Sequence, residues 1–193
     1  MIVLLLGLIL FLGVHSVSIA APGWRGATIT RLGEGPWKAI YSVAAGIGLA
    51  LLIVGYGMAR REPLVLYTPP VPLRHLALLL MLPVFPLLFA AYLPGRLSRL
   101  ARHPMLLATK LWATAHLLAN GTLADVLLFG GFLAWAVADR ISVKRRPPEQ
   151  AHAVPGAAPR PMNDWLAIVG GLTVYALIVL WAHRLLFGVS PLP

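Results

Sequence analysis

The segment 102–129, RHPMLLATKLWATAHLLANGTLADVLLF, decides the fold because it combines apolar runs with polar side chains that are costly in hydrocarbon. Residues 105–119 are apolar enough to lie in a bilayer. They are also fewer than the roughly 20 residues that a straight helical span requires. The segment therefore predicts a short membrane helix and not an ordinary span.

The residues that follow predict a turn and a second helix. Asn120-Gly121 is a dipeptide typical of turns. Thr122 and Asp125 have the spacing of a capping box, so Asp125 is interpreted as a helix cap in preference to a catalytic acid. Residues 104–141 are thus predicted to form a tight helical hairpin. Its turn lies at or inside the membrane, where protein or water must shield the backbone.

The composition extends this conclusion to the whole chain. Of 193 residues, 59% are hydrophobic and only 11% are charged, against roughly 25% charged in soluble domains. The absence of cysteine excludes disulfides, thiolate metal sites and iron–sulfur clusters. The predicted fold is an all-α, polytopic membrane bundle of about six helices, with apolar segments near 2–21, 37–59, 73–93, 105–119, 122–141 and 164–187.

Three parts are predicted along the chain: a transmembrane bundle over 1–141, a cytoplasmic proline-rich linker over 142–163, and a final helix and tail over 164–193. His152 lies in the linker and is interpreted as solvated. Pro83, together with Pro86, should kink the third span. The first segment has no basic residue before it, which favours a retained helix over a cleaved signal peptide.

The basic residues predict the orientation of the chain. Lys and Arg total 16 against 6 Asp and Glu, and most of the basic residues fall on one side if the N-terminus is outside. The positive-inside rule therefore predicts both termini in the periplasm of a bacterial inner membrane. The positive charge is explained by this topology, so the lipid bilayer and not nucleic acid is the expected partner.

Five of the six histidines lie in or beside apolar segments: His15, His75, His103, His116 and His183. At 1.5 Å per residue, His15 lies about 9 Å and His116 about 18 Å from the inner end of its segment, so these two are the most embedded. Two imidazoles from different helices suit the axial positions of b-type haem. Alternatively, each imidazole is structural and bonds to a backbone carbonyl or to a hydroxyl such as Ser16 or Thr109.

The 105–119 helix carries further candidates around such a cofactor. Trp112, His116 and Asn120 share one face with Thr109 by i, i+3/i+4 spacing. A different face carries His103, at the helix entrance, and Lys110. Lys110 either extends inward along the His103 face or meets a haem propionate. The weaker candidates for the surroundings are Arg102, His103, Lys110, Trp112 and Asn120.

Three stretches resemble the NnrU family of bacterial membrane proteins, which are associated with nitrite and nitric oxide respiration: LGLILFLGVHS, RLGEGPWKAIYS and the segment 102–129. The family includes the plastid zeta-carotene isomerase, which holds b-type haem with two histidines. The resemblance implies that His15 and His116 are axial ligands of the haem iron. It also implies a small apolar substrate or a respiratory nitric oxide reductase complex as partner. His103 matches a position without a settled role.

Arg102-His103-Pro104 is also similar to the RHPxYxG element of isoprenylcysteine carboxyl methyltransferases, which bind S-adenosylmethionine. Leu106 and Ala108 replace its tyrosine and glycine. Three hypotheses therefore stand: a haem-binding protein that senses, transfers electrons or isomerises a substrate; a methyltransferase; and a non-enzymatic assembly factor. Among enzymatic roles, the haem-dependent isomerase is favoured over the methyltransferase.

Overall fold

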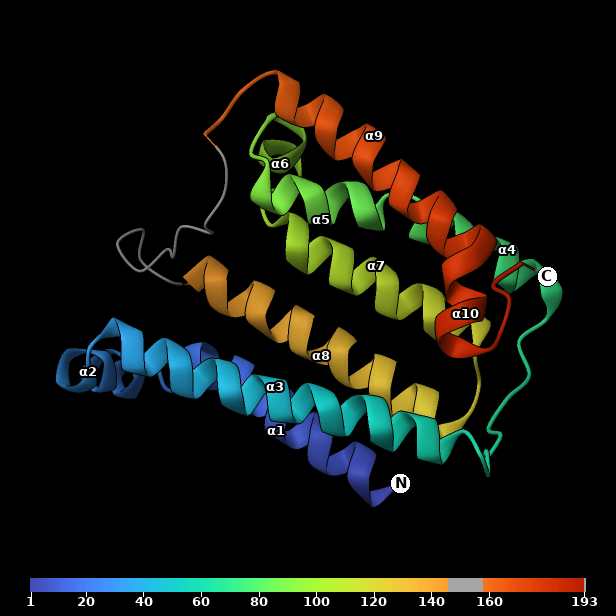
Figure 1. Ribbon diagram of the computed structural model, residues 1–193, viewed down its shortest axis with the longest axis horizontal. Coiled ribbons are helices and arrows are strands. Elements are labelled where there is room, and N and C mark those ends of the chain that lie inside the picture. The colour runs from blue at the N-terminus through green and yellow to red at the C-terminus, as the bar shows by residue number, and fades with distance from the viewer. Residues whose placement is uncertain (146–157, 193) are drawn as a thin grey trace.

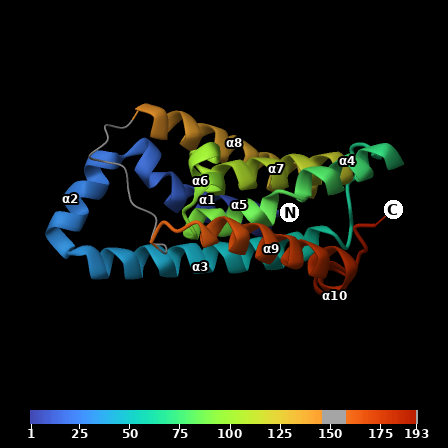
Figure 2. The same ribbon diagram turned by 90° about the horizontal axis from the view of Figure 1, so that it is seen from above.

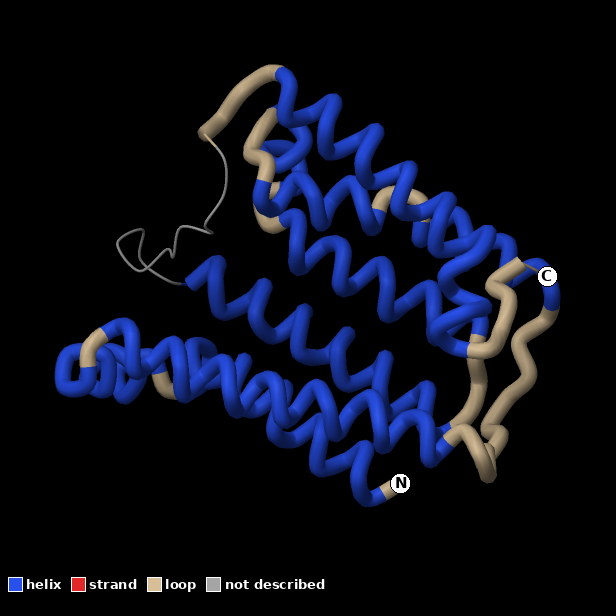
Figure 3. The backbone as a smooth tube through the Cα atoms, viewed as in Figure 1, coloured by secondary structure: helices blue, strands red, loops and turns tan. Residues whose placement is uncertain are grey.

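The computed structural model describes residues 1–145 and 158–192, which are all-helical and contain no β-strand (Figure 3). Within these residues, five stretches are long and apolar enough to cross a membrane: Ile2–Ala20, Glu34–Ala59, Val71–Tyr92, Leu123–Arg145 and Met162–Phe187. The predicted helical membrane bundle is confirmed. The predicted short helix forms as α7 (Pro104–Ala119, 16 residues).

Helix α8 (Leu123–Arg145) joins two groups of helices (Figure 1). On one side it packs against α1 (Ile2–Ala20), which pairs with α3 (Glu34–Ala59). On the other side it packs against α7, which contacts α4 (Val71–Met81) and α5 (Val84–Tyr92). Helix α9 (Met162–Leu177) packs on α5. Seen from above, α3 and α9 lie along one side of the molecule and α7 and α8 along the other (Figure 2). Both termini lie at the same end of the bundle (Figure 1).

Glycines allow α1 and α3 to approach closely. A Cβ atom on Gly48 would lie 2.8 Å from the backbone nitrogen of Phe11, and one on Gly55 would overlap the backbone of Leu4. Small residues at such crossings are what allow membrane helices to pack without a hydrophobic driving force. Gly46 and Gly57 of the same helix face open space instead. The glycine pattern therefore predicts the contact, but only Gly48 and Gly55 make it.

The predicted kink in the third span lies at Leu82 and Pro83, where a short break in helical hydrogen bonding separates α4 from α5 while both residues keep α-helical backbone angles. Pro83 has no amide hydrogen, and the amide of Leu82 bonds to the Leu79 carbonyl (3.3 Å) in a tighter turn. The Leu78 carbonyl is instead satisfied from another helix, by the hydroxyl of Tyr175 in α9 (3.0 Å). The break is thus stabilised by the last span.

The start of α9 also completes a short helix at the other end of the bundle. The Asp164 carboxylate accepts hydrogen bonds from the amides of Arg96 and Leu97, each 2.9 Å long, at the start of α6 (Arg96–Ala101). A carboxylate at a helix N-terminus satisfies amides that have no partner within the helix. A Cβ atom on Gly95 would overlap this carboxylate, so a side chain there would force Asp164 to move.

Some elements were not predicted from the sequence. Both α6 and α2 (Pro22–Leu32) are short helices that follow spans, and α2 ends at Gly33, whose φ of 88° is left-handed. The final span contains a π-helical segment (Ile178–Ala182) before α10 (His183–Phe187). Helix α8 continues to Arg145, beyond its expected end near 141. Most of the predicted proline-rich linker, including His152, lies outside the described residues.

Candidate functional site

The loop after α3 shields the turn of the α7–α8 hairpin. The amides of Leu66 and Tyr67 both donate to the carbonyl of Gly121 (2.8 and 3.1 Å), and the amide of Leu123 donates to the Leu64 carbonyl (2.8 Å). The Tyr67 hydroxyl also donates to the Leu117 carbonyl. Protein therefore supplies the backbone shielding that the sequence predicts for this turn.

Asp125 has the predicted capping role and a second one. Its Oδ2 accepts hydrogen bonds from the amide and hydroxyl of Thr122 (2.9 and 2.6 Å), and the Asp125 amide donates to the Thr122 hydroxyl (3.3 Å). Its Oδ1 accepts a hydrogen bond from Tyr56 of α3. This buried carboxylate is thus fully used in joining α3 to the start of α8, which is a structural role.

His15 lies where α1, α3 and α8 meet. Its Nδ1 is 2.7 Å from the carbonyl oxygen of Phe11, one turn earlier. Because a carbonyl only accepts, Nδ1 carries a hydrogen, and in the neutral imidazole Nε2 therefore keeps its lone pair. The ring contacts Phe11 (centroids 4.3 Å apart), Tyr41 (5.3 Å) and Trp135 (5.9 Å).

His116 has the same arrangement on α7. Its Nδ1 is 2.8 Å from the carbonyl oxygen of Trp112, so its Nε2 is also the unprotonated nitrogen. The ring is stacked on Phe129 of α8, with centroids 4.5 Å apart. Asn120 donates to the His116 carbonyl (2.9 Å). Trp112, His116 and Asn120, which the sequence placed on one face, are therefore brought together. The carbonyl bonds considered as a structural alternative are present at both histidines, and they leave Nε2 available.

An aromatic floor on α8, formed by Phe129, Phe132 and Trp135, connects the two histidines. Trp112 contacts Phe129 and Phe132 (centroids 5.0 and 5.4 Å), and Phe11 contacts Phe132 at 5.6 Å. The i, i+3, i+6 spacing of the three floor residues is visible in the sequence. Only the structure shows that both histidines contact the floor. His15 meets α8 at Trp135 and His116 meets it at Phe129, six residues or about 9 Å apart along the axis.

Trp135 carries the one buried side-chain nitrogen or oxygen without a hydrogen-bond partner among the described residues, its indole Nε1. A buried donor without an acceptor costs about 1–3 kcal/mol. Such groups require an explanation, and an acceptor bound nearby is one of the usual ones. This nitrogen belongs to the ring that lies edge-on to His15.

The remaining predicted residues form a separate basic group at the start of α7. Arg102 is exposed, and its φ of 59° is the left-handed bend between α6 and α7. His103 follows as the N-cap of α7. Burial, followed by the charge of Arg140, lowers the pKa of His103, while Asp139 opposes this shift and Lys110 adds to it. The structure therefore groups Lys110 with His103, as their shared face indicated.

The two outer histidines differ in their surroundings, and His183 lies close enough to His116 to interact with it electrostatically. His75 is exposed on α4. The Nδ1 of His183 lies 2.8 Å from the Val189 carbonyl, and its ring contacts Phe187 at 4.9 Å. Within residues 1–145 and 158–192, no three His, Cys, Asp or Glu side chains are placed together to hold a metal ion.

Comparison with known proteins identifies the family. A family model described as NnrU protein matches residues 3–191, which is nearly the whole chain, so the chain belongs to the NnrU family. No curated protein and no solved structure matches the chain.

Proposed function

Proceeding from membership of the NnrU family, we propose that this chain binds b-type haem through His15 and His116. We further propose that it acts in nitrite and nitric oxide respiration in the bacterial inner membrane. The observation that carries the proposal is the buried Trp135 N–H, which has no acceptor among the described residues and lies beside the His15 ring, whose Nδ1 is bonded to a backbone carbonyl. The carboxylates of haem propionates are acceptors for such a donor.

The donor set fits haem. A porphyrin supplies the equatorial ligands of its iron, so two imidazoles are enough, and no cluster of carboxylates or thiolates is needed. A ligating histidine usually donates its other N–H to a carbonyl, which fixes the ring orientation. Both His15 and His116 have this bond to the carbonyl one turn earlier.

Helix direction favours a shared site. Side chains in a helix lean toward its N-terminus. Helices α1 and α7 run in opposite directions (Figure 1), so the rings of His15 and His116 lean toward each other from contact points about 9 Å apart on α8. The aromatic floor provides an apolar, water-poor surface between them, which is the surrounding that an embedded haem requires.

When bound, haem would supply a redox-active iron suited to electron transfer or redox sensing. The chain's own residues would hold and orient it: His15 and His116 through Nε2, and Trp135 through its N–H. Phe129, together with Phe132, would exclude water. Arg102, His103 and Lys110 form the basic group at the start of α7 and are not needed as ligands in this proposal.

The absorption spectrum tests the proposal. Protein expressed with haem supply and purified in detergent should show a Soret band. His15→Ala and His116→Ala should each abolish the band. His75→Ala is the matched control, because this exposed imidazole lies away from the floor, and it should leave the band unchanged. A wild-type protein without the band, or loss of the band in His75→Ala alone, would overturn the assignment.

Membrane orientation and the respiratory role need separate tests. A C-terminal alkaline phosphatase fusion should be active if both termini are periplasmic, whereas a fusion after Arg102 should be inactive. Deletion of the gene should impair nitrite or nitric oxide respiration. If the chain acts by assembling a nitric oxide reductase, the deletion should reduce assembled reductase, and normal reductase levels would exclude that role.

A further inference from the structure

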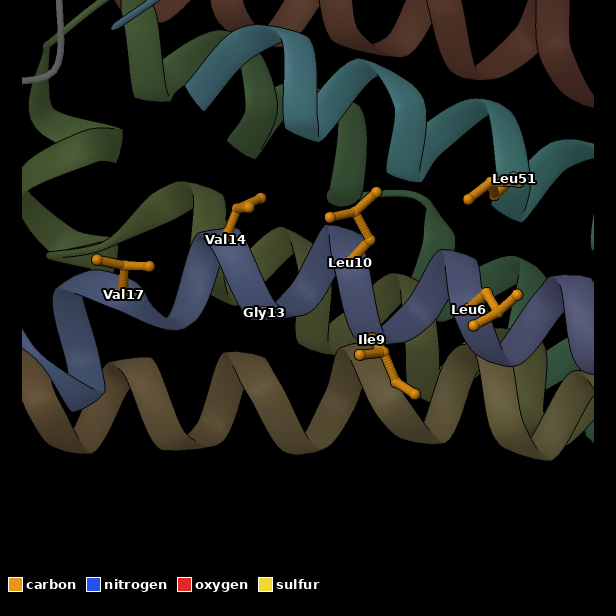
Figure 4. A pocket seen from close by; sticks show the side chains of 7 residues that line it. All are labelled: Leu6, Ile9, Leu10, Gly13, Val14, Val17 and Leu51. Atoms are coloured by element: carbon orange, nitrogen blue, oxygen red, sulfur yellow. The ribbon is translucent and has the colours of Figure 1, made fainter. Parts of the chain in front are cut away.

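Helix α1 borders an apolar groove that is distinct from the aromatic floor (Figure 4). The groove has a volume of about 490 Å³ and is formed by one stripe of α1 with a single residue of α3. Its lining consists of Leu6, Ile9, Leu10, Gly13, Val14, Val17 and Leu51. In a chain that spans the bilayer, such a groove faces acyl chains.

A second recess, with a more polar lining, lies next to the groove. This recess of about 330 Å³ lies between α1, α2 and α3. Val14 and Val17 line both cavities, so the groove and the recess are adjacent. The polar lining of the recess comes from His15, Ser18, Arg25, Glu34, Lys38 and Tyr41.

The residues that line the recess carry one net positive charge, from Arg25 and Lys38 against Glu34, and the Asp139 carboxylate acts on Tyr41 from outside this lining. Lys38 forms an ion pair with Glu34 (3.1 Å), so these two charges offset each other. Arg25 is half-buried and has no ion-pair partner among the described residues; its guanidinium lies 6.0 Å from the ring centre of Trp37. Trp37 also meets Trp24 edge to face, at 5.9 Å. Tryptophan and arginine together are typical of the level of lipid headgroups.

The shape and charge together point to an anionic phospholipid, and we propose that one such molecule binds here. Its phosphate lies at Arg25 and one acyl chain lies along the groove from Val17 toward Leu6. An arginine guanidinium matches phosphate geometry through paired N–H donors. This inference is independent of haem, because it assigns no role to the Nε2 of His15.

Native mass spectrometry tests the site. The purified protein is exchanged with equal amounts of phosphatidylglycerol and phosphatidylcholine, and the lipid retained per chain is counted. One phosphatidylglycerol should be retained in preference. Arg25→Gln should weaken its retention about fivefold, the effect of one basic residue near anionic lipid. Arg61→Gln, in the exposed loop at the other end of the bundle, is the matched charge control and should change nothing.

A second pair of variants tests the groove. A Cβ at Gly13 meets nothing within 4 Å, so Gly13→Leu should fill the groove without disturbing the packing and should displace the lipid. Gly46→Leu has the same open surroundings on α3 but lies outside the groove, so lipid should be retained. Equal retention of both lipids, unchanged binding in Arg25→Gln, or equal effects of both leucine variants would overturn the proposal.

Two further measurements distinguish a lipid site from a free anion site, and loss of lipid binding from loss of haem binding. Excess inorganic phosphate should not displace the lipid if the groove contributes to binding, and full displacement by phosphate would mean that only a free anion site exists. The Soret band is recorded on the same samples. Arg25→Gln should keep the band while losing lipid, so failure of the lipid site is distinguishable from failure of haem binding.

Discussion

The indole of Trp135 lies edge-on to the imidazole of His15, with ring centroids 5.9 Å apart and planes at 88°, and its buried N–H has no acceptor among the described residues. A folded protein keeps such a donor at a cost, unless a bound group satisfies it. The unsatisfied donor, which lowers the stability of the fold, therefore lies beside the candidate haem ligand His15.

Replacing Trp135 with Phe should reveal this cost. In haem-free protein, Trp112→Phe contracts a ring in the same cluster without removing the orphan donor. Trp135→Phe should therefore be about 1 kcal/mol more stable than Trp112→Phe, which corresponds to about 2–4 °C in melting temperature. Thermal unfolding in detergent measures the difference. Equal stability of the two variants would show that Trp135 has an acceptor in the haem-free state.

The Tyr56–Asp125 bond should contribute measurably to the packing of α3 on α8. Asp125→Ala removes the cap and leaves the Tyr56 hydroxyl without its acceptor, so it should cost about 2–4 kcal/mol. Tyr56→Phe should cost less, about 1–2 kcal/mol, because the cap remains. In the double variant the two costs should not add, since both single changes break the same bond. Strict additivity in denaturant unfolding would contradict the coupling.

The crossing of α1 and α3 should depend on Gly55 and not on Gly57. Gly55→Ala forces a methyl group into the backbone of Leu4, and the helices must separate, at a cost of about 1–3 kcal/mol. Gly57→Ala meets open space and favours the helix, so it should be neutral or slightly stabilising. Melting temperatures of the two alanine variants check this directly, and similar losses in both would refute the role of the crossing.

The pKa of His103 should affect stability in a defined pH range. Burial and the Arg140 charge lower this pKa below 6.5. Above pH 6.5 the imidazole is neutral in both the folded and the unfolded state, so it contributes nothing to the pH dependence of stability. As the pH falls below 6.5, the unfolded chain binds the proton first, so stability falls until the pH passes the folded pKa. His103→Gln should flatten this region of the stability profile. Arg140→Gln should raise the pKa of His103, as NMR titration of its ring would report.

The sequence predicted the elements better than their contacts. Asn120-Gly121 located the hairpin turn, the Thr122–Asp125 spacing located its cap, and Pro83 located the break in the third span. Each of these signals is local, because it depends on backbone chemistry within a few residues. Helix α2 was missed although Pro22 and Gly33 mark its ends, because its composition is neither apolar nor strongly periodic.

The candidate site was predicted less completely for a different reason. His15 and His116 stand out from composition, since imidazoles are rare within apolar segments. The aromatic floor cannot be recognised in the sequence, because Phe129, Phe132 and Trp135 are ordinary residues for a membrane helix. Their role follows from the position of α8 between α1 and α7. The packing of α8 between these two helices is tertiary structure, which residue spacing alone does not predict.

The bond between Tyr175 and the Leu78 carbonyl has a consequence for biosynthesis. The ribosome makes the chain from its N-terminus. The broken third span is therefore complete nearly a hundred residues before Tyr175, its partner, is synthesised. The amides of Arg96 and Leu97 likewise lack their carboxylate acceptor until Asp164 is synthesised. This half of the molecule therefore completes its packing only after the last span inserts, and a chain truncated before Met162 should be a substrate for membrane proteases.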